Sequence, residues 1–358
     1  SQGGGQQPID MNKYLMNKTL RTAIIGYGVV GKRRRFFIEG NKKYELLYIS
    51  DIKFKKNIKN KSIIFFKNYK EILKKNIDTV FITLPTYLAA KVTLAFIKKG
   101  VHVFCEKPPA KNLNEIKKVL QIYKKNKKIK VKYGFNHRYH SSVKLAKKII
   151  KSKKYGEIIN LRCLYGKSKI LASYHNRFIG TKDDWRSKKK LSGGGILLDQ
   201  GIHLLDLLRF FNGDFQEYKS FISNKFWNYD VEDNAFALMR DKNGVIASIH
   251  STATQWQHTF RIEIATKYAL IELKGILSGT KSYGKESLRV IERSPKSSKG
   301  YKIKNQYYFD KDNSWKEEID EFANIILKKL PIKTGNIYDA VEVMNMVEKI
   351  YRADKKNV

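Results

Sequence analysis

The stretch TAIIGYGVVGKRRRFF, residues 22–37, decides the fold of this chain. A short apolar run enters three glycines, spaced Gly26-x-Gly28-x-x-Gly31, and a helix-like segment follows. In such a unit the first glycine turns the chain, the second lets the backbone approach a pyrophosphate, and the third lets helix pack on strand. Asp51 closes the next apolar run, twenty residues beyond Gly31, where a carboxylate can accept hydrogen bonds from an adenosine ribose. The stretch predicts a dinucleotide-binding fold, with a purely structural glycine turn as the alternative.

Apolar runs alternate with lysine-rich segments of helical period over residues 19–140. Further apolar runs end at Asp51, Pro85, Pro109 and Asn136, and helical periodicity covers 68–75, 88–99 and 113–124. Continuous apolar strands separated by helices predict a parallel, doubly wound sheet with both faces covered. We therefore expect residues 19–140 to form an N-terminal Rossmann domain.

The second half, residues 141–358, has a different pattern. Strand-like alternating stretches occupy 157–166, 218–227, 234–241, 244–255, 260–275 and 288–293, and helices are expected at 143–151, 197–211, 315–329 and 338–352. This pattern predicts an α+β domain with a large, open, mostly antiparallel sheet and flanking helices. Residues 1–10 precede Met11 and resemble an expression-tag remnant, so we expect 1–18 to be a remnant and leader and the native start to be Met11 or Met16.

The charge balance is strongly basic, with 72 Lys+Arg against 33 Asp+Glu and a net charge of +39. A concentrated basic patch would indicate a nucleic-acid or anionic-membrane partner. Lysines are instead spread over nearly every segment, so we predict no specific nucleic-acid partner; a substrate with a phosphate or carboxylate suits this surface better.

Cysteine and histidine positions exclude several classes of site. Cys105 and Cys163 lie far apart inside apolar runs, which predicts reduced packing residues and no disulfide framework. His102 and His250 also lie in apolar strands and are interpreted as core residues, and no side-chain set has metal-ligand spacing, so a metal-free site is expected. Because no apolar run reaches the length of a membrane span, we expect a cytoplasmic protein without a membrane partner.

Glu106-Lys107-Pro108 follows the fourth predicted strand, at the sheet edge where open α/β folds bind ligands. Lys107 could hold a substrate hydroxyl beside a nicotinamide and favour its alkoxide, whereas a solvated lysine beside a turn is the plain alternative. Residues 192–203, SGGGILLDQGIH, place Asp199 and His203 four apart on one helical face. A histidine whose charge is tuned by a carboxylate suits proton transfer near neutral pH, although most such pairs are ordinary surface pairs.

At this point the sequence resembles the glucose-fructose oxidoreductase / inositol dehydrogenase / MocA (Gfo/Idh/MocA) family of nicotinamide-dependent oxidoreductases, over nearly the whole chain from Thr22. The matching motifs are the glycine fingerprint, VHVFCEKP at 101–108, GFNHRYHSSVKLAKKII at 134–150, KYGEI at 154–158, DWR at 184–186 and GGGILLDQGIHLLDLLRFF at 193–211. FWNYDVEDNAF at 226–236 is similar to members in sugar and surface-polysaccharide pathways.

The resemblance implies hydride transfer between NAD(P) and a secondary alcohol of a sugar, most readily a nucleotide-linked sugar. Lys107 would contact the reacting hydroxyl and the nicotinamide, Asp199 would bind substrate, and His203 would be the general acid/base. The implied cofactor contacts are Gly26, Gly28, Val29, Val30, Gly31, Asp51, Thr83, Pro85, Glu106, Lys107 and Asn136. The implied or suspected substrate contacts are Lys107, Arg138, Tyr165, Trp185, Arg186, Asp199, Gln200 and His203, with Tyr139, His175 and Arg177 as further candidates.

Some expectations stay open. Asp51 favours NAD, but Lys53 and the basic run 32–35 could attract a 2′-phosphate, so NADP remains the alternative. The chain has Thr83-Leu84-Pro85-Thr86 where family members often carry Thr-Pro-Asn, and it lacks the histidine often present in the first helix. The resemblance also implies a homodimer or homotetramer. An NAD-dependent glycosidase, an inositol or free-sugar dehydrogenase, and a noncatalytic dinucleotide sensor are the competing functions.

Overall fold

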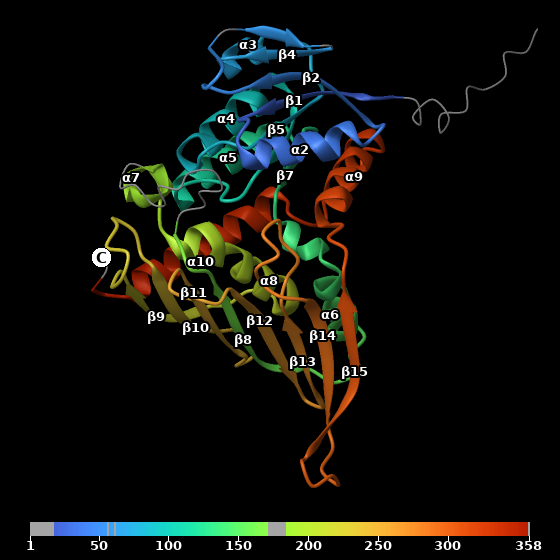
Figure 1. Cartoon of the computed structure of the whole chain (residues 1–358), viewed down its shortest axis with the longest axis vertical. Coiled ribbons are helices and arrows are strands. Elements are labelled where there is room, and N and C mark those ends of the chain that lie inside the picture. The colour runs from blue at the N-terminus through green and yellow to red at the C-terminus, as the bar shows by residue number, and fades with distance from the viewer. Residues whose placement is uncertain (1–17, 56, 61, 171–183, 357–358) are drawn as a thin grey trace, which may run out of the picture.

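Two stacked parts make up the molecule, each built on one sheet (Figure 1). The computed structural model describes residues 18–55, 57–60, 62–170 and 184–356. The upper part in Figure 1 holds the N-terminal sheet, and the lower part holds the larger C-terminal sheet. The predicted combination of a Rossmann-type domain and a mostly antiparallel domain is confirmed.

The N-terminal sheet has seven strands in the order β3-β4-β2-β1-β5-β6-β7. Its strands are β1 (Leu20–Ile25), β2 (Tyr44–Ser50), β3 (Ile58–Asn60), β4 (Ile63–Phe66), β5 (Thr79–Ile82), β6 (His102–Cys105) and β7 (Val131–Tyr133). Its helices are α2 (Val29–Glu39), α3 (Tyr69–Leu73), α4 (Thr86–Lys99) and α5 (Leu113–Lys125). Neighbouring strands are parallel except β3 and β4, a short antiparallel pair that the sequence pattern did not predict. The strand order reverses between β1 and β5, which places the ligand-binding edge at the glycine turn.

The C-terminal sheet has eight strands in the order β15-β14-β13-β12-β8-β11-β10-β9. They are β8 (Ile158–Gly166), β9 (Glu217–Ser223), β10 (Asn234–Arg240), β11 (Ile246–Thr252), β12 (Thr259–Thr266), β13 (Ala269–Lys274), β14 (Glu286–Arg293) and β15 (Tyr301–Phe309). All pairs are antiparallel except β8 with β11. We did not predict β15, whose residues are almost all exposed at the sheet edge and so lack a buried, alternating pattern.

Helices cover one face of the C-terminal sheet and leave the other open. The connecting elements are η1 (Asn136–Tyr139), η2 (Trp185–Ser187) and the short α7 (Lys189–Ser192). The covering elements are α6 (Ser141–Lys151), η3 (Leu197–Gly201), α8 (Ile202–Asn212) and α10 (Ile337–Ala353), and Figure 1 shows α6, α8 and α10 lying against the same side of the strands. On the open side Phe221 is 79% exposed and Leu238 is 53% exposed, while the adjacent Ala237 is buried.

Helix α9 (Ser314–Leu327) packs on the N-terminal sheet although it lies far along the chain. Its Phe322 meets Phe81 and Phe104 edge to face, with ring centroids 5.9 Å and 5.6 Å away. Tyr44 Oη also donates to the main-chain oxygen of Ile319 at 2.6 Å. The N-terminal core therefore includes residues from the C-terminal half, and the predicted division at residue 140 does not separate two independent cores.

Several residue assignments can be compared with burial. Cys105 and Cys163 are buried free thiols, as predicted, and burial raises the pKa of Cys105 to about 12. The core interpretation of His102 and His250 is wrong, because both are only half-buried. His102 Nδ1 accepts from the main-chain N–H of Lys130 at 2.9 Å, and His250 stacks on Phe236 on the open sheet face.

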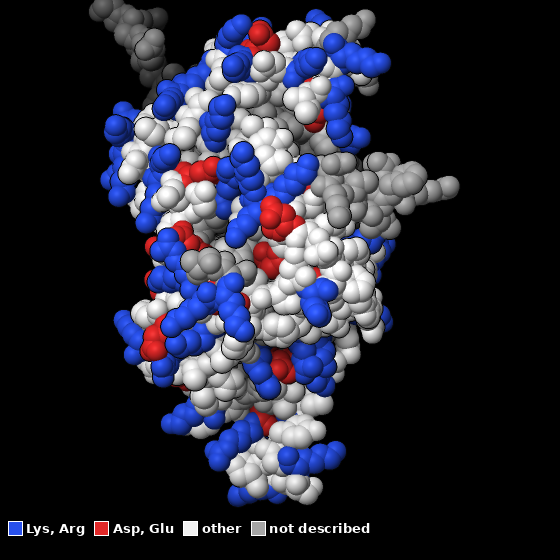
Figure 2. Space-filling view, turned by 90° about the vertical axis from the view of Figure 1, so that its left-hand side faces the viewer, with Lys and Arg blue, Asp and Glu red and all other residues white. Residues whose placement is uncertain are grey.

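Basic side chains are distributed over the visible surface in Figure 2 instead of gathering in one patch. This distribution agrees with a generally basic composition. Among the described helices, none is long and apolar enough to cross a membrane.

Candidate active site

The glycine turn between β1 and α2 has the geometry of a phosphate cradle. Gly26 has φ of 94°, and a Cβ there would lie 2.6 Å from the Thr83 main-chain oxygen. A Cβ on Gly31 would lie 2.1 Å from the Gly26 oxygen, whereas a Cβ on Gly28 would meet nothing within 4 Å. The backbone is thus packed tightly behind the turn and open in front of Gly28. No side chain caps α2, so its first N–H groups are free to face an anion.

Residues around the turn hold this shape. Thr83 Oγ1 donates to the Gly26 oxygen at 2.6 Å, so its hydroxyl supports the turn directly. Asp51 Oδ2 accepts from the Tyr27 main-chain N–H at 2.6 Å, which fixes the half-buried carboxylate at the rim of the cradle. Val29 and Val30 form the exposed first turn of α2, and Pro85 precedes α4 at the same sheet edge. The predicted cofactor residues from both strand ends therefore lie beside one another, and they fit a dinucleotide.

The basic run in α2 is largely occupied by protein contacts. Arg33 and Arg34 both lie over the Trp315 ring, and Arg33 also pairs with Asp312. Arg35 bonds to Glu39 and to the Tyr27 hydroxyl. Of the groups invoked for NADP, only Lys32 and Lys53 are exposed.

Arg34 joins the sheet edge to α9 through two carboxylates. Its Nε donates to Glu106 Oε1 at 2.6 Å and its Nη2 donates to Glu318 Oε2 at 2.8 Å. Arg34 and Glu318 are fully buried, and Arg34 Nη1 and Glu318 Oε1 have no partner within the described part of the chain. Burial raises the pKa of Glu318 to about 7, against the charge of Arg34 and with a further rise caused by Glu106. Glu106, predicted as a cofactor contact, is thus committed to Arg34.

Lys107 and Asp199 meet where the two parts of the molecule face each other. Lys107 Nζ donates to the Asp199 main-chain oxygen at 2.6 Å. Asp199 Oδ2 accepts from Lys167 Nζ at 2.9 Å. Burial alone would raise the pKa of Asp199, but the charges of Lys167, Lys107 and Arg186 outweigh it and hold that pKa well below its usual value. The Asp199 carboxylate is therefore ionised.

His203 follows Asp199 across the change from the π-turn of η3 to the α-helix α8. The expected tuning of His203 by Asp199 is not seen: we find no hydrogen bond between them, because Asp199 points to Lys167. Instead, the His203 ring stacks on His137, with centroids 3.7 Å apart and planes 14° apart. Burial lowers the pKa of His203 well below its ordinary value, and the charge of Lys107 adds to this effect. His203 is thus a neutral imidazole, whose buried Nδ1 has no partner among the residues placed by the structure.

A small cavity beside Asp199 collects further predicted residues. Trp185, Arg186 and Asp199 line it together with Thr86 and Pro108. The Arg186 guanidinium lies 4.4 Å from the centre of the Trp185 ring. Gln200 is close by, and its Nε2 is buried without a partner among the described residues. The DWR motif (184–186) and the glycine-rich segment (192–203) therefore line the same cavity, as we expect if both contribute to one site.

Other predicted substrate residues have structural partners. The prediction that Arg138 contacts the substrate is corrected by the structure. Its guanidinium is buried and held by Asp206 at 2.6 Å and 2.8 Å and by Asp339 at 3.3 Å. Tyr139 is half-buried, and its hydroxyl bonds to Lys132 Nζ and to the Glu321 carboxylate.

The remaining predictions have mixed positions. Asn136 donates to Ser314 Oγ at 3.2 Å, and the Tyr165 hydroxyl bonds to His137 Nε2 at 3.1 Å behind the His203 ring. His175 and Arg177 lie outside the described residues. Sequence reasoning missed Lys167, because a lysine after a strand has no distinguishing spacing in a chain with 72 basic residues. It also did not single out His137, although the GFNHRYH motif contains it.

A doubly wound sheet with a glycine cradle at its switch point, and titratable groups opposite that cradle, defines the class of dinucleotide-binding oxidoreductases. Residues 20–135 match the oxidoreductase family with an NAD-binding Rossmann fold, and residues 143–271 match the GFO/IDH/MocA C-terminal domain. These matches cover more than half of the chain, which belongs to the Gfo/Idh/MocA family.

Named relatives include sugar dehydrogenases. Levoglucosan dehydrogenase of Pseudarthrobacter phenanthrenivorans is 27% identical over 202 residues, 49% of this chain and 50% of that protein. Glucose-6-phosphate 3-dehydrogenase of Bacillus subtilis is 28% identical over 202 residues, 54% of this chain and 55% of that protein. The chain thus spans about half the length of these curated relatives.

Solved structures share the fold over nearly the full length. A levoglucosan dehydrogenase complex with NADH has a TM-score of 0.79 and 20% identity, covering 95% of this chain and 98% of that chain. The WlbA dehydrogenase of Bordetella pertussis, in complex with NADH and UDP-GlcNAcA, has a TM-score of 0.74 and 17% identity, with the same coverage.

Proposed function

We propose that this chain transfers hydride between NAD and a secondary alcohol of a sugar, most readily a nucleotide-linked sugar used in surface-polysaccharide biosynthesis. The observation that carries the proposal is the convergence of Lys107, ionised Asp199 and neutral His203 at the sheet edge that also bears the glycine cradle. Relatives whose names specify a sugar, a sugar phosphate or a UDP-sugar subunit support this substrate range.

The chain's own residues divide the work. NAD, when bound, supplies the hydride acceptor. Lys107 holds the reacting hydroxyl, and its positive charge favours the alkoxide over the alcohol. His203 accepts the hydroxyl proton on its imidazole, which its neutral state permits, and returns that proton in the reverse reduction. Asp199 binds a neighbouring substrate hydroxyl, because its ionised oxygens are acceptors.

The test combines native mass spectrometry of the purified protein with NAD(P)H fluorescence during titration with sugars. A panel of UDP-, GDP- and CDP-sugars and free inositols should contain a compound that reduces NAD. If a glycoside instead releases free sugar without accumulating NADH, the NAD-dependent glycosidase is the better assignment. Retained NAD with no response to any compound would contradict the dehydrogenase proposal.

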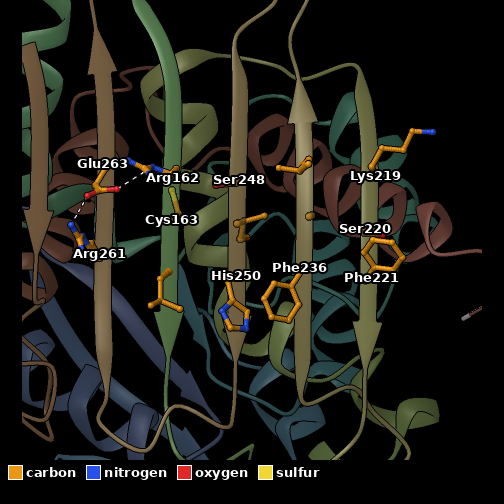
Figure 3. A pocket seen from close by; sticks show the side chains of 14 residues that line it. Arg162, Cys163, Lys219, Ser220, Phe221, Phe236, Ser248, His250, Arg261 and Glu263 are labelled. Atoms are coloured by element: carbon orange, nitrogen blue, oxygen red, sulfur yellow. Dashed lines mark hydrogen bonds and ion pairs between the residues drawn. The ribbon is translucent and has the colours of Figure 1, made fainter.

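We also propose that the open face of the C-terminal sheet joins two copies of this chain into a homodimer or part of a homotetramer. Figure 3 shows Phe221, Phe236 and His250 side by side on this face, with the Arg162–Glu263–Arg261 group beside them. The depression that they line has a volume of about 490 Å³. Such a concentration of exposed apolar side chains is typical of an interaction surface.

A further inference from the structure

Lys167 is held firmly at the end of a central strand. It follows β8, and its main-chain N–H donates to the Thr252 oxygen at 3.0 Å while its oxygen accepts from the Gln255 N–H at 3.1 Å. A Cβ on the preceding Gly166 would lie 2.5 Å from the Gln255 Cβ, so the backbone has little room to shift. The backbone of Lys167 is therefore held in place, and the ion pair with Asp199 holds the ammonium in the site.

The Lys167 ammonium has hydrogen-bond donors that its contact with Asp199 does not occupy. Its Nζ carries three N–H groups, and the bond to Asp199 Oδ2 at 2.9 Å uses one of them. No other side-chain bond from this Nζ is present among the described residues, yet the side chain is only 14% exposed. An ammonium held against a carboxylate can accept a second anionic partner on its remaining donors.

Among the residues that the structure describes, cations outnumber acids around Asp199. Lys107 and Lys167 both contact this residue, and Arg186 lines the same cavity. Two other acids are close but are engaged: Glu106 binds Arg34 at 2.6 Å, and Asp184 lies 3.8 Å from Arg186, near the limit of an ion pair. A neutral sugar needs no such excess of positive charge.

Hydroxyl and imidazole groups lie near Lys167. Ser168 Oγ bonds to His258 Nε2 at 3.0 Å, and His258 Nδ1 bonds to Ser282 Oγ at 2.7 Å. Burial lowers the pKa of His258, and the charges of Lys167 and Lys169 lower it further, which places both lysines near this ring. The neutral ring donates to one of these two hydroxyls and accepts from the other, and the hydroxyl that accepts keeps its own hydrogen, a donor of the kind that binds phosphate oxygens.

We propose that the substrate carries a phosphate group, and that Lys167 selects it by bridging that phosphate and Asp199. This inference rests on the proposed function, since it concerns the same site. The phosphate can belong to a sugar phosphate or to the diphosphate of a nucleotide sugar. Lys167 is a specificity-determining residue in either case, and the reacting hydroxyl stays with Lys107 and His203.

The test compares NAD reduction by glucose and N-acetylglucosamine with reduction by their 6-phosphates and UDP derivatives. The variants are Lys167→Met, which removes the charge, and Lys167→Arg, which keeps it. Lys242→Met is the matched control, because this exposed lysine sits at the opposite end of the β8–β11 pair, about 20 Å away at the rise of a β-strand. Each sugar is also titrated into the NAD-loaded protein by calorimetry.

We expect one phosphorylated form to exceed its free sugar in kcat/KM, and Lys167→Met to reduce that ratio by about 10- to 100-fold, as loss of a charge-assisted hydrogen bond would. Lys167→Arg should restore most of the ratio, and Lys242→Met should leave it unchanged. This ratio separates recognition of the phosphate from a general effect of the substitution on Asp199, because a general effect would change kcat/KM for the free and the phosphorylated sugar together. The 6-phosphate and UDP arms identify the source of the phosphate.

Two results would overturn the inference while leaving the proposed oxidoreductase intact: equal kcat/KM for free and phosphorylated sugars, or a preference that survives Lys167→Met. If none of these sugars reduces NAD, the wider panel described above decides the proposed function and the calorimetry decides the present inference. Tighter binding of a phosphorylated sugar that is lost in Lys167→Met would then support it, and equal binding of both forms would overturn it.

Discussion

Replacing Glu318 by glutamine should make the stability of this protein less sensitive to pH between about 4.5 and 7.5. The carboxyl is fully buried, and burial raises its pKa from an ordinary 4.5 to about 7. In the unfolded chain it loses its proton near pH 4.5, whereas the folded protein retains that proton up to about pH 7. Unfolding therefore releases a proton in this window, so Glu318's contribution to stability is complete below pH 4.5 and is lost as the pH rises through 7.

The size of the effect follows from the same values. A difference of about 2.5 pKa units, at 1.36 kcal/mol each, is roughly 3 kcal/mol. With an unfolding entropy of about 2.1 cal/mol/K per residue over 358 residues, that free energy corresponds to about 4 °C in melting temperature. Glutamine has nearly the shape of the protonated carboxyl and can still accept the Arg34 N–H, so the variant should fold.

The comparison must be made between variants, because other buried groups act in the opposite direction. Burial lowers the pKa of His102 to about 4, and its contribution to stability is lost as the pH falls below about 6.5. Differential scanning calorimetry at pH 5 and pH 8 should show that the parent loses about 4 °C more than Glu318→Gln. Glu317→Gln is the matched control on α9, since that side chain is 38% exposed and should follow the parent. Equal pH dependence in the parent and Glu318→Gln would refute the reasoning.

Three further changes test the site and the open sheet face. His203→Ala should leave NAD binding nearly unchanged and reduce turnover by about 10² or more, as loss of a general acid/base does; near-parental turnover would remove His203 from the mechanism. Asp51→Ala should weaken NAD binding and so reduce the protein's preference for NAD over NADP. Fluorescence titration of both dinucleotides measures this preference, and an unchanged preference would show that Asp51 does not contact the ribose. Phe221→Lys should shift sedimentation towards the monomer, because it places a charge on the proposed interface; Lys242→Met is the control, and an oligomer that withstands Phe221→Lys would exclude this face.

Local patterns were sufficient to predict the N-terminal fold. The glycine spacing, the preceding apolar strand and the acidic end of β2 are all short-range features, and each reflects a steric or hydrogen-bonding need of one turn. β3 and β4 were missed because they are short and their register depends on pairing with each other and with β2. β15 was missed because its exposed edge position imposes no alternation.

The candidate site was only partly predictable for a different reason. Lys107, Asp199 and His203 were recognisable from their motifs, but their partners depend on contacts between distant segments. The i, i+4 spacing suggested that Asp199 tunes His203, whereas the π-turn and Lys167 direct Asp199 elsewhere. Arg138 has the charge and the hydrogen-bond donors expected of a substrate-binding residue, yet Asp206 and Asp339 hold its side chain in the interior.

The return of α9 to the N-terminal sheet has a consequence for the order in which this protein can be made. Ile24, Phe81 and Phe104 stay uncovered until Ile319 and Phe322, which lie far later in the chain, have left the ribosome. The dinucleotide-binding part therefore cannot finish folding before α9 has been synthesised, even though its strands come first. A nascent chain stalled after residue 140 should expose this hydrophobic, aromatic surface and bind chaperones, whereas a chain that includes α9 should bury it.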